Sequence, residues 1–78
     1  MNEVDVGYIL SVTPYREYDA MVHFLGEKYG LMRLVLAGFY KPNSKQARLG
    51  VEFSKVRIRF KYRDNALLRI QSGELLDA

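Results

Sequence analysis

The chain has 78 residues, a net charge of +3 and no cysteine. This length allows one small domain with a single core, and the lack of cysteine excludes disulfides and thiolate metal sites. No apolar run approaches the ~20 residues of a membrane span, and the acidic start is unlike a signal peptide. We therefore expect one soluble, cytoplasmic domain over residues 1–78, with no cofactor, no membrane contact and no small-molecule substrate.

The charge is unevenly distributed along the chain. Residues 1–30 and 64–78 are acidic on balance, whereas residues 31–63 carry nine basic residues against Glu52 alone. A polarised surface of this kind is typical of proteins that bind a polyanion. A solvated basic face without a ligand is the alternative.

The first two strands are predicted over residues 5–15 and 18–27. The first run is rich in β-formers, and its alternation predicts that Tyr8, Leu10 and Val12 point inward. The second run is apolar on both faces and contains no breaker residue, so a helix competes with a strand there.

A tight turn is predicted at Tyr29-Gly30, because glycine adopts positive φ without steric cost. A third strand follows over residues 31–37. Further along, Ser44 is expected to cap a short helical turn over residues 45–49, which Gly50 ends.

The basic run from Lys55 to Arg63 is the most informative segment of the sequence. Strict alternation places five cations on one face of a strand and four apolar side chains on the other: Lys55, Arg57, Arg59, Lys61 and Arg63 against Val56, Ile58, Phe60 and Tyr62. Neighbouring like charges repel, which indicates an anionic partner that neutralises them. Nucleic acid is the first candidate.

A turn at residues 63–66 leads to a fifth strand over residues 67–72, with Leu68 and Ile70 inward. Five strands with one helical turn between the third and the fourth predict an all-β fold, a five-stranded oligonucleotide-binding (OB) barrel. A small SH3-like barrel has similar strand content and competes with it.

The predicted nucleic-acid site combines cations for phosphates with aromatic rings for unpaired bases. Phe39 and Tyr40 are the candidates for stacking, although a loop aromatic can equally pack over the end of the barrel. Arg57, Arg59 and Lys61 rank first among the cations because alternation makes them neighbours. The full set of cations is Arg33, Lys41, Lys45, Arg48, Lys55, Arg57, Arg59, Lys61 and Arg63.

Catalysis is not expected from this sequence. His23 is the only histidine, and no spacing signals a catalytic triad, a metal site or a glycine-rich phosphate loop. The sequence also contains no base-reading motif, so weak sequence preference is predicted.

Several segments, in one order and without large gaps, resemble the N-terminal domain of the bacterial recombination mediator RecO family. They are Gly7-Tyr-Ile-Leu-Ser-Val-Thr-Pro-Tyr15 with Glu17 and Asp19-Ala-Met-Val22, then Tyr29-Gly30-Leu31, Leu36-Ala-Gly38 with Lys41-Pro42 and Ser44, Phe53, and Gly73-Glu-Leu-Leu76. The resemblance implies an OB-fold that binds single- and double-stranded DNA in DNA repair and recombination, in a bacterial, nucleoid-associated protein. It further implies roles in strand annealing and recombinase loading beside a RecR-type mediator and the single-strand-binding protein.

Two features depart from the family pattern. The usual larger C-terminal helical domain does not follow residue 78, so the chain is either an excised domain or a stand-alone relative. Phe39-Tyr40 also replaces residues that are typically more basic in the family. Two other functions remain open: a protein-interaction module that docks an acidic partner, and an RNA-binding OB domain.

Overall fold

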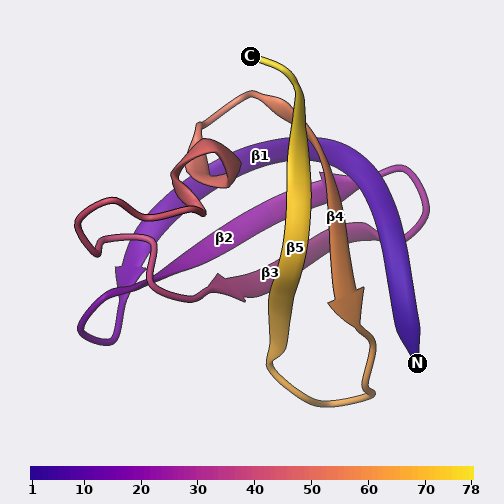
Figure 1. Ribbon diagram of the computed structural model, residues 1–78. Helices are drawn as coiled ribbons and strands as arrows, with labels where there is room; N and C mark the ends of the chain where they lie inside the picture. Colours follow the sequence, from indigo (N-terminus) through magenta and orange to yellow (C-terminus); the bar gives the residue numbers. More distant parts are fainter.

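The computed structural model describes residues 1–78, whose five strands close into a barrel (Figure 1). The elements are β1 (Asn2–Tyr15), β2 (Asp19–Gly26), β3 (Gly30–Leu36), the 3-10 turn η1 (Ala47–Gly50), β4 (Lys55–Lys61) and β5 (Leu68–Asp77). Their order around the barrel is β1-β2-β3-β5-β4, with β1 and β4 paired antiparallel and β3 and β5 paired parallel. The predicted all-β OB-fold class is confirmed, and the helical alternative for residues 18–27 is wrong because β2 occupies this run.

The long strand β1 holds the barrel together because it pairs with two neighbours. Its first half pairs with β4 and its second half with β2, and Gly7 belongs to both ladders, opposite Val56 on β4 and Gly26 on β2. A Cβ atom at Gly7 would collide with the carbonyl oxygen of Leu25. Glycine at this position therefore permits the close approach of backbones at which β1 passes from one neighbour to the other.

The inward direction predicted for Tyr8 and Leu10 is wrong. Ile9 is fully buried, whereas Tyr8 is 48% exposed. The β1–β2 register shifts between Ile9 and Ser11 and leaves Leu10 without a partner. This β-bulge resets the alternation, so that Ile9 and the partly buried Val12 both pack against the core.

The inward faces predicted for strands β4 and β5 are confirmed. The core is built from alternate residues of β2, β3 and β4 together with β5 and η1, namely Ala20, Val22, Phe24, Met32, Leu34, Leu36, Leu49, Val56, Ile58, Phe60 and Ile70, with Ile9 from β1. The prediction that Tyr62 joins this core is wrong. Strand β4 ends at Lys61, and Tyr62 is 40% exposed beyond it.

Asp5 ties β1 to the turn between β2 and β3. Its side chain is buried and accepts three backbone N–H bonds, from Val6 (2.8 Å), Lys28 (2.9 Å) and Tyr29 (3.0 Å). Gly30 completes this turn with φ of +70°, as predicted for Tyr29-Gly30. A buried carboxylate that satisfies three donors fixes the start of β3 relative to β1.

The loop between β3 and β4 is fastened to the β1–β2 turn. Gly38 N–H donates to Asp19 Oδ1 at 2.8 Å, and Tyr40 N–H donates to the Tyr18 carbonyl at 2.9 Å. The predicted helical turn is the 3-10 turn η1, which begins after Gln46, two residues later than predicted. Ser44 Oγ accepts the Gln46 N–H at 3.1 Å, so it fixes the turn that leads into η1, while η1 itself has no side-chain cap.

Strand β5 continues past the predicted end at residue 72 and reaches Asp77. In Figure 1 the loop between β4 and β5 lies at the bottom of the view near the N-terminus, and the C-terminus lies at the opposite end. The short η1 lacks the length and hydropathy that a membrane-crossing helix requires.

Candidate nucleic-acid interface

The outward face of β4 carries the predicted cations, but a carboxylate neutralises its middle. Glu74 lies opposite Arg57 in the β4–β5 ladder. Its Oε2 accepts a bond from Arg57 Nη1 and its Oε1 one from Arg59 Nη1, both at 2.9 Å. The Arg59 hydrogen bond, followed by that of Arg57, lowers the pKa of Glu74 below its ordinary value. These two arginines are therefore paired, whereas the sequence pattern predicted a free array.

The basic residues at the end of β4 form no such ion pair. Lys61, Arg63 and Arg69 line a hollow of about 280 Å³, together with Leu67 and Gln71. None of the three cations forms an ion pair with a carboxylate, and no acidic side chain lines the hollow. The structure therefore brings together three exposed cations that no carboxylate neutralises and that an anionic ligand can contact.

Arg69 was not among the predicted site residues, although the sequence contained the signal for it. Leu68 and Ile70 were predicted inward, which places Arg69 outward by alternation. The pairing of Phe60 with Ile70 brings it beside Lys61, and the parallel pairing with Val35 brings it beside β3. The second contact depends on the barrel closing between β3 and β5, which strand patterning alone does not show.

Arg33 joins this basic group from β3. It is exposed, forms no ion pair and lies opposite His23 in the β2–β3 ladder. His23 Nδ1 lies 3.0 Å from Ser11 Oγ on β1, so the only histidine has a structural partner.

We call Arg33, Lys61, Arg63 and Arg69 the hairpin cluster. In OB-folds, the face of strands 2 and 3 and the loops 1–2 and 4–5 bind oligonucleotides, and the hairpin cluster lies in this region.

A larger hollow of about 550 Å³ adjoins the first. Seven of its ten lining residues are hydrophobic, among them Tyr29, Leu31 and Tyr62, and Arg33 and Arg63 are among its polar residues. Arg63 also lines the smaller hollow. An aromatic surface and a cationic surface therefore meet at the loop between β4 and β5.

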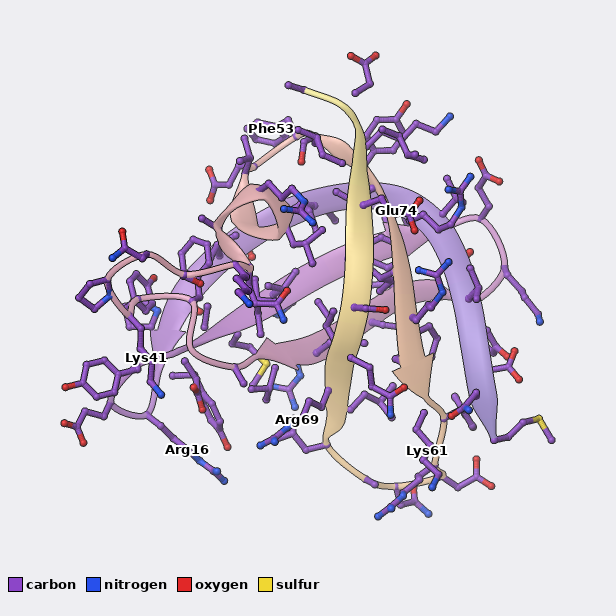
Figure 2. The ribbon with its side chains drawn as sticks, viewed as in Figure 1. Arg16, Lys41, Phe53, Lys61, Arg69 and Glu74 are labelled. Carbon is purple, nitrogen blue, oxygen red and sulfur yellow. The ribbon has the colours of Figure 1, made fainter.

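The β1–β2 turn adds a cation on the side of the molecule that carries the hairpin cluster. In the view of Figure 2, Arg16 of this turn lies on the lower side together with Arg69 and Lys61, and Phe53 and Glu74 lie above them. The Arg16 guanidinium carbon lies 5.1 Å from the centroid of the Tyr15 ring. The predicted site residue Lys41 has its Nζ 5.8 Å from the centroid of the Tyr18 ring. The loop of Lys41 lies here because its backbone bonds hold it to the turn.

The two aromatic candidates for stacking differ in their surroundings. Phe39 packs against the core and against Gly50, whereas Tyr40 meets the Phe39 ring edge-on at 4.9 Å and remains exposed. Tyr40 is thus the more accessible ring. Of the other predicted cations, Lys45 and Arg48 lie exposed around η1, and Lys55 lies opposite Asp77.

A second charged group secures the N-terminal end of the barrel. Glu3 accepts a bond from Lys28 Nζ at 2.8 Å and another from the Tyr29 hydroxyl. These bonds, that of Lys28 first, lower the pKa of Glu3, and the same carboxylate raises the pKa of Lys28 and of Tyr29. The charges of Glu3 and Lys28 neutralise each other, so we assign this group a structural role.

The family assignment agrees with this geometry. No curated protein matches the chain. The family model described as "Recombination protein O N terminal" matches residues 1–78. The chain therefore belongs to the family of recombination protein O N-terminal domains, which are domains of a recombination and repair mediator.

Proposed function

We propose that this domain binds DNA, both single- and double-stranded, through the hairpin cluster. The observation that carries the proposal is that Arg33, Lys61, Arg63 and Arg69 meet at one end of the barrel without a carboxylate partner. Cations left unpaired beside one another repel, and phosphates relieve this repulsion while releasing their own counterions. The paired Arg57 and Arg59 contribute less, because Glu74 already neutralises part of their charge.

The binding is directed at the nucleic-acid backbone. The only helical element is the four-residue η1, which is too short to serve as a recognition helix in a major groove. If the four cations of the hairpin cluster each neutralise one phosphate, log K falls against log salt with a slope of roughly −2.8 for a single strand and −3.6 for duplex. Weak sequence preference follows from the same geometry.

Within recombination and repair, we propose that the domain supports strand annealing and recombinase loading beside a RecR-type mediator and the single-strand-binding protein. Its family membership supports this role. The contribution of the domain is binding and positioning of DNA, with no catalytic step.

Fluorescence anisotropy with a labelled single-stranded oligonucleotide tests the proposal. Binding at low salt with Kd below about 10 μM, weakening as salt rises, is the expected result. No binding at that concentration would refute it. RNA and DNA oligonucleotides of equal length, measured side by side, show whether RNA is the preferred ligand.

A second candidate function, docking of a partner protein, is favoured by the edge of β5. Strand β3 pairs with β5 only at Leu68 and Arg69, so this edge has no strand partner along the rest of β5. An extended peptide can add to such an edge. A partner bound in this way would protect amides of residues 70–77 from hydrogen exchange, whereas DNA bound at the hairpin cluster would protect residues 61–69.

A further inference from the structure

An aromatic column runs from the core to the larger hollow. The buried Phe60 ring meets the Tyr29 ring edge-on, with centroids 5.5 Å apart, and Tyr29 stacks on Tyr62 with centroids 5.6 Å apart and planes at 17°. Tyr62 is the outermost ring, is 40% exposed and lines the hollow. Packing against Tyr29 orients the ring of Tyr62, so a further ring can stack there at low entropic cost.

The chemistry of the two hollows matches the two parts of a nucleotide. The larger hollow is lined by rings and aliphatic side chains such as Leu31, and its volume of about 550 Å³ lies in the range of small-ligand sites. The smaller hollow is lined by Lys61, Arg63 and Arg69. Arg63 lines both hollows, so a ligand that is apolar and flat at one end and anionic at the other can fill them together.

We propose that the larger hollow takes up one unpaired base, which stacks on Tyr62 while the adjoining phosphates lie in the smaller hollow. The inference rests on the proposed function, and it adds a site for a base to a surface for phosphates. Asn65, in the loop between β4 and β5, lines the larger hollow and supplies an amide that donates to and accepts from the edge of a base.

This site distinguishes a single strand from a duplex. A base in a duplex is stacked and paired, so it enters the hollow only after unstacking, which costs a few kcal/mol. An unpaired base enters without that cost. The domain therefore binds single strands, gaps and frayed ends more tightly than a blunt duplex of the same length.

The test compares two oligonucleotides of equal length, one of thymidines and one of abasic sites, which have the same phosphates. The wild-type chain should bind the thymidine strand about tenfold more tightly, the equivalent of about 1.4 kcal/mol and within the range for stacking one base. In Tyr62→Leu, which removes the ring and keeps apolar bulk, this preference should fall to about twofold or less. Tyr62→Phe should retain it.

Two further variants keep the test decisive. Tyr8→Leu removes a similarly exposed ring on β1 and should keep the preference. Ala66→Ile, at an exposed loop position that lines the larger hollow, should reduce the preference even if Tyr62→Leu fails to fold. Equal binding of both oligonucleotides by the wild type overturns the base site but leaves the proposed DNA binding intact. Failure to bind either oligonucleotide overturns both.

Discussion

Replacing Arg69 with glutamine should weaken DNA binding more than the same replacement at Arg57. Both changes remove one positive charge from neighbouring parts of the β4–β5 hairpin. Arg69 forms no ion pair and lines the smaller hollow, whereas Arg57 donates to Glu74 at 2.9 Å. The two variants therefore separate the hairpin cluster from the array that the sequence pattern favoured.

The expected size of the effect follows from the charges. A guanidinium about 4 Å from a phosphate in a largely aqueous environment contributes ~1 kcal/mol, so Arg69→Gln should weaken binding about fivefold. For Arg69→Gln, the slope of log K against log salt with a single strand should become less steep by roughly 0.7. The Arg57 guanidinium is already bound to Glu74, so it is less free to contact a phosphate directly and attracts it at longer range, where salt screens the attraction. We therefore expect less than about a twofold loss for Arg57→Gln.

Anisotropy titrations at several salt concentrations measure both quantities. Thermal unfolding of each variant, followed by circular dichroism, shows whether the fold is retained. A loss at Arg57→Gln equal to or greater than that at Arg69→Gln would refute the reasoning. The DNA would then follow the outer face of β4, and Glu74 would have to move aside on binding.

The remaining predictions concern the charges and the backbone that support this surface. Glu74→Gln frees the guanidiniums of Arg57 and Arg59 and should strengthen DNA binding at low salt. Its control is Glu52→Gln, which makes the same change in net charge at a residue without an ion pair and should strengthen binding less. Equal effects of the two variants would show that the freed arginines lie outside the DNA path. Because the folded pKa of Glu74 is lowered, its stabilisation is complete above the ordinary value of about 4.5 and is lost as pH falls through the folded pKa. The difference in melting temperature between wild type and Glu74→Gln should therefore disappear in acid, and a constant difference would be inconsistent with the ion pairs. Asp5→Ala leaves three backbone donors without their acceptor and should cost roughly 3 kcal/mol or more of unfolding free energy in a denaturant titration; a cost below ~1 kcal/mol would show that water replaces the carboxylate. Gly7→Ala should be destabilised on the same scale because its Cβ meets the Leu25 carbonyl, and a melting temperature like that of the wild type would refute this assignment.

Period-two patterning predicted most of the fold. The alternation in β4 and β5 indicated which of their side chains face the core, whereas the run that forms β2 is apolar on both faces and indicated no direction. The order of five strands with one turn indicated the barrel. The errors in β1 arose at Leu10, where an extra residue in the ladder reverses the faces. No side-chain pattern marks the bulge in the sequence. A strict alternation that places Val12 inward therefore also places Tyr8 inward, which is the wrong face.

The site was less predictable than the fold, because it depends on contacts between distant segments. Alternation indicates the face of Arg57 and Arg59, but their pairing with Glu74 depends on the β4–β5 register and on the extension of β5 beyond residue 72. Similarly, Arg69 reaches β3 only because β3 and β5 pair in parallel. Sequence charge therefore predicts a polyanionic ligand, and strand pairing determines which cations carboxylates leave unpaired.

A titration of backbone amide NMR shifts with a short single-stranded oligonucleotide tests the central claim most directly. The account predicts the largest changes at Arg33 and across residues 61–69, with small changes at Glu74 and at Phe53, which is at the other end of the barrel (Figure 2). Changes centred on Arg57, Arg59 and Glu74, with residues 61–69 unaffected, would contradict it.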